Sequence, residues 1–300
     1  MLDESTLKGG GFIKQRQPDY FVVRVKVLVG DASVEQLRTI ADIAEQYGRG
    51  ETHFTVRQCI EIPWVRIEHF DEITAKLAAV GLGPGACGPR VRVPVCCPGA
   101  AICKRGLNDT KALARTLDAR MYDGSRILPH KFKVGVTGCG AACAKPQEND
   151  LGFMGAVRPL FDERDGACIA CGVCGQACPT GAISFDDEGH PVIDYERCEA
   201  DGKCVAACPT KAIRAEDTGW RVFAGGKFGR EPVLGVELVR FVSSERAEAI
   251  ADAVLATYMA NGRKGERLRN TMDRIGHEAF RDQVLAQAQA AVPTTEGDAA

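Results

Sequence analysis

The chain has 300 residues, of which 45% are hydrophobic and 26% are charged, a balance typical of globular proteins with one large domain or a few small ones. Its 38 Lys and Arg against 40 Asp and Glu give a net charge of −2, which argues against general affinity for nucleic acid or an anionic membrane. No apolar run approaches the ~18 residues that span a bilayer, and residues 1–15 lack the apolar core of a signal peptide. We therefore expect a cytoplasmic protein without a membrane span.

Residues 1–85 are predicted to form a small α+β unit. Alternating apolar residues predict a strand over 20–29, and Ser33 with Gln36 forms a capping box that begins a helix ending near Gly48. A second alternating stretch, 53–62, predicts a strand, and a second helix is expected over 70–82. The apolar face expected for the first helix comprises Val34, Leu37, Ile40, Ala41 and Ala44. The second strand is expected to bury Phe54, Val56, Ile60 and Ile62, with Thr55, Arg57, Cys59 and Glu61 on its polar face.

Residues 86–160 and 216–291 are predicted to form one domain, interrupted by a cysteine-rich insert at 161–215. A strand over 90–96 leads into a cysteine loop, followed by a helix capped by Asn108 or Asp109 that ends near Gly124. A strand over 131–137 leads into a second cysteine loop. Beyond the insert we expect a strand region over 220–242, a helix over 244–261, helical structure over 266–291 and a disordered tail at 292–300.

The insert carries two similar cysteine runs about 30 residues apart. The 14 cysteines of the chain are too many for disulfides in a reducing compartment and point to metal or redox ligands. The first run, Cys168, Cys171, Cys174 and Cys178 followed by Pro179, has the spacing of bacterial iron–sulfur proteins. The second run is Cys198, Cys204 and Cys208 followed by Pro209. Resemblance to two-cluster ferredoxins implies one cluster on Cys168, Cys171, Cys174 and Cys208, and another on Cys178, Cys198 and Cys204.

The second run departs from this pattern at Asp201, which stands where a fourth cysteine is expected. A carboxylate is a harder ligand than a thiolate and is less suited to iron–sulfur clusters. Three interpretations remain open: Asp201 binds one iron of a [4Fe-4S] cluster, the site holds a [3Fe-4S] cluster, or an outside ligand completes it. Each leaves an electron-transfer module.

A further set of four cysteines comprises Cys97, Cys103, Cys139 and Cys143. Two separate loops with glycines at Gly99, Gly138 and Gly140 could close around one cluster. A structural zinc site is the plain alternative, but zinc pairs are usually spaced by two to four residues. The five- and three-residue spacings resemble the iron–sulfur motif of the sirohaem-dependent nitrite and sulfite reductases, in which the last cysteine, here Cys143, also bridges to the sirohaem iron.

Other segments resemble the same family over roughly residues 14–280. They are residues 55–58 (Thr-Val-Arg-Gln), the 128–133 segment with its Lys-Phe-Lys sequence, Arg90 and Arg92 before the first cysteine loop, and a glycine-rich segment with Gly225, Gly226 and Lys227. Together with the insert, they resemble the C-subunit type of anaerobic sulfite reductase. The resemblance implies an α+β half-repeat, made of a ferredoxin-like unit and a sirohaem and [4Fe-4S] domain, with an inserted ferredoxin domain. It also implies that Gly225, Gly226, Lys227, Arg57 and Arg90 contact the macrocycle.

The basic residues support an anion site independently of the resemblance. Arg57, Arg90, Arg92, Lys131 and Lys133 lie on three predicted strands of a chain with no excess of positive charge. Lys131 and Lys133 share one face, and Phe132 and Val134 face the core. Converging Arg and Lys side chains bind carboxylates and small oxyanions. Arg57, Arg92, Lys131 and Lys133 are therefore our candidates for substrate binding, with the lysines as proton donors because burial can lower a lysine pKa.

The resulting hypothesis is a sirohaem-dependent reductase that converts sulfite to sulfide with six electrons relayed by the insert. A nitrite reductase would use nearly the same ligands, and an iron–sulfur electron-transfer protein without a macrocycle is the alternative from another class. No nucleotide or flavin motif is visible, so the donor is expected to be a ferredoxin or other electron-donor subunits. The chain contains one of the two related halves of many sirohaem enzymes, which leaves an oligomer open. Cys59 and Cys87 are expected to be buried or half-buried thiols. Cys96 is not expected to be a ligand, because only Cys97 gives the five-residue spacing to Cys103.

Overall fold

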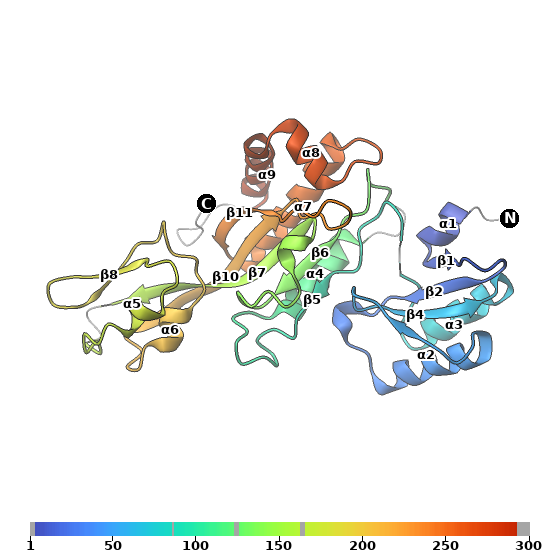
Figure 1. Ribbon diagram of the computed structural model, residues 1–300, viewed down its shortest axis with the longest axis horizontal. Coiled ribbons are helices and arrows are strands. Elements are labelled where there is room, and N and C mark those ends of the chain that lie inside the picture. The colour runs from blue at the N-terminus through green and yellow to red at the C-terminus, as the bar shows by residue number, and fades with distance from the viewer. Residues whose placement is uncertain (1–3, 86, 123–125, 163–165, 293–300) are drawn as a thin grey trace.

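The N-terminal unit is a four-stranded antiparallel sheet with two long helices. The computed structural model describes residues 4–85, 87–122, 126–162 and 166–292 (Figure 1). The strands β1 (Phe12–Lys14), β2 (Phe21–Val25), β3 (His53–Phe54) and β4 (Ile60–Val65) have the order β1-β2-β4-β3. The helices are α1 (Glu4–Gly9), α2 (Val34–Tyr47) and α3 (Phe70–Ala79). Val23, Val25 and Ile62 are fully buried between sheet and helices, which confirms the predicted α+β class.

The predicted start and end of α2 are confirmed, but only two of the five residues predicted on its apolar face are buried. Ser33 accepts a hydrogen bond from the Gln36 amide and the Gln36 side chain accepts one from Ser33, as in a capping box. Ile40 and Ala44 are buried, but Val34, Leu37 and Ala41 are exposed because the buried stripe continues through Ile43 and Tyr47 instead. The helix is therefore rotated relative to the sequence-based expectation.

The predicted strand over 53–62 is wrong. The chain turns back at residues 55–58, so β3 and β4 form a hairpin in which Phe54 pairs with Ile60. Gln58 takes a left-handed conformation (φ 58°) to close the turn. Phe54 and Val56 are consequently exposed, and Arg57 lies on the turn rather than on the polar face of a strand.

The central domain is built on a five-stranded mixed sheet in the order β11-β10-β7-β6-β5. Its strands are β5 (Val95–Cys96), β6 (Val134–Thr137), β7 (Leu151–Phe161), β10 (Ile213–Ala224) and β11 (Val236–Val242). Strands β5, β6 and β7 run parallel, whereas β10 is antiparallel to both β7 and β11. The helices α4 (Thr110–Met121), α7 (Ser244–Asn261), α8 (Leu268–Ile275) and α9 (His277–Ala291) share one core with this sheet. Its largest fully buried side chains include Trp220, Tyr258, Phe132, Phe153 and Phe280.

Several predicted boundaries in this domain are confirmed and others change. Helix α7 matches the expected 244–261 segment, and Asp109 caps α4 by accepting hydrogen bonds from two amides of its first turn. The strand expected over 90–96 is shorter, with β5 at Val95–Cys96 and a single bridge between Val91 and Phe132 before it. Gly276, at φ 92°, separates α8 from α9. Gly124 and the predicted tail after Val292 lie outside the described residues.

The insert is carried at the end of the longest strand pair. Phe161 at the end of β7 pairs directly with Ile213 at the start of β10, and the intervening chain projects beyond the sheet, away from the N-terminal unit (Figure 1). It contains two short helices, α5 (Val173–Ala177) and α6 (Lys203–Ala207), and one hairpin of β8 (Ile183–Phe185) and β9 (Pro191–Ile193). Single 3-10 turns occur at Leu28–Gly30, Ile67–His69 and Pro146–Glu148. In the part of the chain described, no helix combines the length and apolar character needed to cross a membrane.

Candidate functional site

The two cysteine loops of the central domain leave neighbouring parallel strands at the same edge. The first follows β5 and the second follows β6, so both lie at the carboxyl ends of these strands. The amide of Gly138 donates a hydrogen bond to Cys97 Sγ over 3.1 Å, and the amide of Leu107 donates to the carbonyl of Gly138 over 2.8 Å. The topology thus brings the loop carrying Cys97 and Cys103 against the loop that carries Cys139 and Cys143.

Glycines permit this close contact between the loops. A Cβ added at Gly99 would meet the Thr110 amide nitrogen at 2.8 Å, and one at Gly138 would meet Gly99 Cα at 3.3 Å. Both residues are buried. Gly140, in contrast, has open space around it. Gly99 and Gly138 therefore have no room for a side chain, and at Gly138 the close neighbours belong to the first cysteine loop.

All 14 cysteines lie in described segments and are free thiols. Cys143 is exposed, whereas the Cys97, Cys103 and Cys139 side chains are partly buried. Across the described residues no three His, Cys, Asp or Glu side chains come close enough to hold a single metal ion. A cluster of several irons spreads its thiolates further apart than one ion does. Cys59 and Cys87 are buried, as expected, and Cys96 is buried as well.

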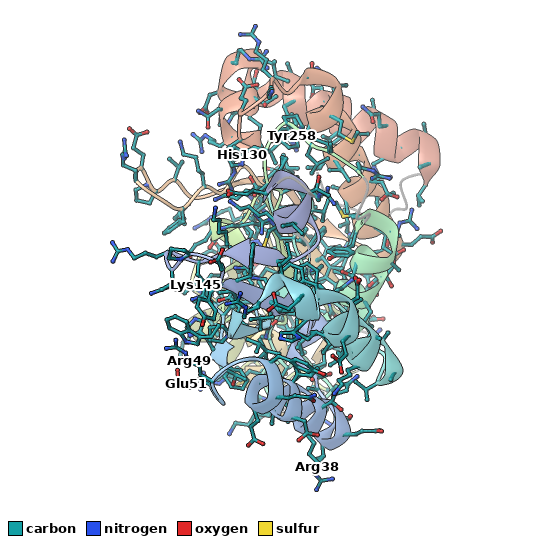
Figure 2. The ribbon with its side chains drawn as sticks, turned by 90° about the vertical axis from the view of Figure 1, so that its right-hand side faces the viewer. Arg38, Arg49, Glu51, His130, Lys145 and Tyr258 are labelled. Atoms are coloured by element: carbon teal, nitrogen blue, oxygen red, sulfur yellow. The ribbon has the colours of Figure 1, made fainter. Side chains whose placement is uncertain are left out.

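Arg57 links the N-terminal unit to the second cysteine loop. Its Nη2 donates to the carbonyls of Val93 and Val134 over 2.6 and 3.0 Å, and its Nη1 donates to Asn149 Oδ1 over 3.0 Å. Asn149 Nδ2 in turn donates to the carbonyl of Lys145 over 2.9 Å. Lys145 follows Cys143 by two residues, and Figure 2 labels it on the flank of the molecule. Arg57 and the Cys143 loop are therefore joined through one asparagine.

Lys131 and Lys133 are organised by a buried ion pair that sequence reasoning missed. Asp150 is fully buried, and Arg267 is 9% exposed. Arg267 Nη2 donates to both carboxylate oxygens of Asp150 over 2.8 Å, and the Lys133 amide donates to Asp150 Oδ2 over the same distance. His130 precedes the two lysines and lies beside the buried Tyr258 (Figure 2). Asp150 thus fixes the backbone from which the lysines extend.

The positive charges on this surface are close enough to perturb one another. Burial and the neighbouring Arg267 and Arg92 lower the pKa of Lys131. Burial, Arg57 and Lys131 likewise lower the pKa of Lys133. Burial lowers the pKa of Arg57 to about 10, with a further contribution from Arg92. We call these five residues, Arg57, Arg92, Lys131, Lys133 and Arg267, the cationic cluster. It is a partly desolvated site suited to an anion.

The other residues predicted to contact the macrocycle make the following contacts in the structure. Gly225 donates its amide to the carbonyl of Asp150, and Gly226 packs so tightly on Asn149 that any Cβ there would clash. Lys227 exchanges two backbone hydrogen bonds with Val233. Arg90 packs on Gly9 and lines a hollow with Lys8 and Lys14. The described contacts therefore do not bring Arg90 or Lys227 to the cationic cluster.

Arg24 is a second residue that sequence reasoning missed. Its guanidinium donates to Cys87 Sγ over 2.8 Å and to Glu61 over 2.6 Å. It also contributes to the lowered pKa of both Arg57 and Arg92. Arg24 occupies an outward position of an alternating strand, β2, which is the signal that could have placed it beside Arg57. Asp150 and Arg267 gave no comparable signal because their pairing joins segments 117 residues apart.

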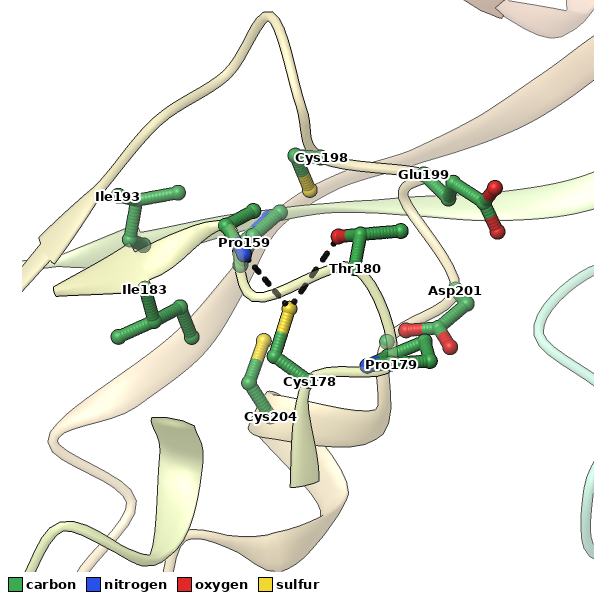
Figure 3. A pocket seen from close by; sticks show the side chains of 12 residues that line it. Pro159, Cys178, Pro179, Thr180, Ile183, Ile193, Cys198, Glu199, Asp201 and Cys204 are labelled. Atoms are coloured by element: carbon green, nitrogen blue, oxygen red, sulfur yellow. Dashed lines mark hydrogen bonds between the residues drawn. The ribbon is translucent and has the colours of Figure 1, made fainter. Parts of the chain in front are cut away.

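Two cavities among the described residues of the insert are each lined by cysteines of both runs. One is lined by Cys178, Cys198, Cys204 and Asp201 (Figure 3). The other is lined by Cys168, Cys171, Cys174 and Cys208. Burial alone would raise the pKa of the Cys178 thiol, but its hydrogen bond with the Thr180 hydroxyl and the one it accepts from the Ala182 amide help to lower that pKa. The structure therefore groups the side chains as the two expected ligand sets require.

The cavity with Asp201 is the one nearer the central domain. The Val157 amide of β7 donates to the carbonyl of Ala200 over 2.8 Å, and Val157 forms a parallel bridge with Asp201. A Cβ at Gly202 would lie 3.5 Å from Leu107 Cδ2. Leu107 belongs to the first cysteine loop and binds Gly138 of the second. Leu107 thus lies between the insert and the paired cysteine loops, with its side chain near Gly202 and its amide bound to Gly138.

Comparisons with known proteins agree with this organisation. Residues 87–291 match the nitrite and sulphite reductase 4Fe-4S domain, and residues 13–80 match the nitrite/sulfite reductase ferredoxin-like half domain. The chain is 37% identical over 278 residues to the coenzyme F420-dependent sulfite reductase of Methanocaldococcus jannaschii, covering 92% of this chain and 44% of that protein. It is 30% identical over 176 residues to the C subunit of the anaerobic sulfite reductase of Salmonella typhimurium, covering 54% of this chain and 50% of that protein.

The fold is also found among solved structures. A dissimilatory sulfite reductase I structure superposes with a TM-score of 0.74 at 20% identity, over 92% of this chain and 74% of that one. The chain spans about half the length of the two named relatives. Two family models that together match most of the chain, with the paired cysteine loops at their predicted place, establish that the chain belongs to the sirohaem-dependent nitrite and sulfite reductase family of iron–sulfur oxidoreductases.

Proposed function

We propose that the chain is the catalytic part of a sulfite reductase. The observation that carries this proposal is the hydrogen-bonded connection from Arg57 through Asn149 to the loop of Cys143. It connects one residue of the cationic cluster to the loop that carries Cys143, a proposed ligand of the [4Fe-4S] cluster. The names of the two relatives described above support sulfite as the substrate.

The residues present fit the cofactors that the family implies. Arg57 Nε is buried without a hydrogen-bond partner among the described residues, although the other two nitrogens of this guanidinium are satisfied. A buried donor of this kind is costly unless a ligand satisfies it. Sirohaem carries many carboxylates, and the cationic cluster supplies the matching donors. Cys97, Cys103, Cys139 and Cys143 supply thiolates, which are the ordinary ligands of a [4Fe-4S] cluster.

When bound, sirohaem and its coupled cluster supply the electron-transfer chemistry. The side chains of the chain do the rest. The guanidinium groups of Arg57 and Arg92 stay charged and hold the anion, because even a lowered arginine pKa stays above neutral pH. Lys131 and Lys133 release protons more readily than ordinary lysines, since their pKa values are lowered. They can donate protons as each hydrogensulfite takes up six electrons and six protons to give hydrosulfide and three waters.

The insert is proposed to deliver the electrons. Cys168, Cys171, Cys174 and Cys208 would hold the outer cluster, and Cys178, Cys198 and Cys204, with Asp201, the inner one. The inner cavity contacts the central domain through Gly202 and Leu107, which supports a relay from the outer cluster to the inner cluster and on to the paired loops. The donor would be a partner protein, either a ferredoxin or another subunit.

The proposal is tested by turnover of the purified chain with reduced methyl viologen as the electron source. Sulfite and nitrite are supplied in separate reactions, and sulfide and ammonia are measured. Faster turnover of sulfite per unit enzyme supports the proposal. Preferential turnover of nitrite would make the protein a nitrite reductase. No turnover of either anion, with no tetrapyrrole extracted by acid–acetone from cells that make sirohaem, would leave an electron carrier.

A further inference from the structure

The two halves of the insert have the same backbone conformation around their cysteine runs. The residues before and after Cys171 and Asp201 adopt matching left-handed conformations, with φ values of 50° at Ala170 and 52° at Ala200, and of 70° at both Gly172 and Gly202. A third match follows at Gly181 and Lys211, both with φ 61°. A left-handed alanine or lysine is costly, so its recurrence shows that the repeat is structural. Asp201 therefore occupies the ligand position that Cys171 occupies in the first half.

Asp201 lines its cavity together with three thiols and takes the fourth place. Figure 3 shows its carboxylate in the wall of the cavity that also holds Cys178, Cys198 and Cys204. The backbone at this place is anchored, because the Val157 amide binds the carbonyl of Ala200 immediately before it. Three thiolates can hold three irons of a cubane. The fourth corner falls to an oxygen ligand.

The carboxylate of Asp201 is engaged by a competing cation. Asp201 Oδ1 accepts a hydrogen bond from the Lys203 amide over 3.1 Å, and Asp201 Oδ2 forms an ion pair with Lys203 Nζ over 3.1 Å. The Lys203 side chain is 61% exposed, so it can swing into solvent, whereas the Asp201 side chain is 21% exposed. The first half has Val173 at the position of Lys203. The ion pair is therefore a feature of the second half alone.

We propose that the Asp201 corner of this cavity is an exchangeable site for a divalent metal ion. Cys178, Cys198 and Cys204 hold a three-iron, four-sulfide core, and Asp201 admits or releases a fourth metal, with Lys203 as the competing cation. This inference rests on the part of the proposed function that places clusters in the insert. A carboxylate binds iron of a sulfide cluster less firmly than a thiolate does, and it accepts other divalent ions as well.

The exchange balances without an external oxidant. A reduced three-iron core takes up Fe²⁺ to form the four-iron core, and no electron is transferred. The bond from an Asp201 oxygen to the metal forms as the ion pair with Lys203 Nζ breaks. Lys203 keeps its proton and moves into solvent. Release of the metal reverses each change.

The test follows the metal content of the insert rather than turnover. Anaerobically purified protein is reduced with titanium(III) citrate, incubated with increasing Fe²⁺, reoxidised and examined by electron paramagnetic resonance. We expect the three-iron signal to disappear with Fe²⁺ and to return after treatment with EDTA. The Asp201→Cys variant should hold four irons at this site and resist EDTA. Zn²⁺ in place of Fe²⁺ should also abolish the three-iron signal in the wild-type protein.

Two further variants separate the roles of the carboxylate and the lysine. Lys203→Val copies the residue of the first half, and loss of an exposed ion pair should tighten Fe²⁺ binding about two- to fivefold. Cys171→Asp is the matched control, because it places the same carboxylate in the outer cavity. It should create a second EDTA-sensitive signal.

The inference is overturned if the wild-type protein shows no signal that responds to Fe²⁺ and EDTA, or if Asp201→Cys responds as the wild type does. An insert without iron, in a protein that still turns over sulfite, would also overturn it while leaving the substrate assignment intact. Exchange without any sulfite turnover would have the opposite meaning. The inner cluster would then be assigned correctly and the proposed reaction would be wrong.

Discussion

Replacing Asp150 with asparagine should be among the most damaging single changes outside the cysteines. Asp150 is fully buried and Arg267 is 9% exposed. The pair is joined by three short contacts of 2.8, 2.8 and 3.1 Å. Asparagine keeps the shape and can still accept from the Lys133 amide, but it leaves the guanidinium buried without its counter-charge. Breaking such a pair from one side costs about 3–5 kcal/mol.

A double variant tests the cause of this loss. If the cost comes from an unpaired buried charge, Asp150→Asn combined with Arg267→Met should be more stable than Asp150→Asn alone. Urea unfolding followed by circular dichroism measures both, at matched cofactor content because bound cofactors add stability. Glu68→Gln, at the exposed pair with Arg66, is the control and should leave the midpoint unchanged. A loss below about 1 kcal/mol for Asp150→Asn, or a double variant less stable than the single one, refutes this explanation.

The remaining predictions concern the proposed anion site and relay. Lys131→Met and Lys133→Met should each weaken sulfite binding about tenfold or more, because a charged hydrogen bond is lost; unchanged sulfite-induced spectral titrations would contradict this. In the wild type the affinity for sulfite should fall as pH rises, and the fall should begin below the ordinary lysine pKa of 10.5, because the lowered pKa values of Lys131 and Lys133 make these side chains lose their charge at a lower pH. A constant affinity up to that pH would argue against a role of these lysines in binding. Leu107→Ala should slow the reoxidation of the insert clusters by sulfite without changing the absorption spectrum of the protein. Stopped-flow rates equal to those of the wild type would show that electron transfer does not depend on this contact. Cys143→Ser should abolish the spectral shift caused by sulfite, whereas an unaltered shift would remove Cys143 from the site.

The elements that depend on local pattern could be predicted from the sequence, and those that depend on distant partners could not. The Ser33 cap, Asp109 cap and helix α7 were predictable because capping and helical spacing act within a few residues. The turn at 55–58 could not be predicted, because the alternating residues on either side of it have the pattern of one continuous strand. The left-handed conformation of Gln58, which helps to reverse the chain there, leaves no signal in that pattern.

The proposed site shows the same division. The cysteine spacings encode their own grouping, since each cavity of the insert gathers the expected side chains. The supports of the cationic cluster are invisible in the sequence. Asp150 and Arg267 meet only because the sheet and α8 pack together, and Asn149 looks like any loop residue until Arg57 reaches it from another unit.

The pairing of Phe161 with Ile213 has a consequence for the modularity of the chain. The insert enters and leaves through two adjacent strands of one antiparallel ladder, so its ends are only one strand spacing apart, about 4.8 Å. A hairpin turn of a few residues could close the same gap. The ladder of β7 and β10 therefore closes at this end without the insert, apart from the amide of Val157, which donates to the carbonyl of Ala200. The insert behaves as an enlarged hairpin loop. Another electron-carrying module with closely spaced ends could be grafted at the same place, which would separate the choice of donor from the chemistry of the central site.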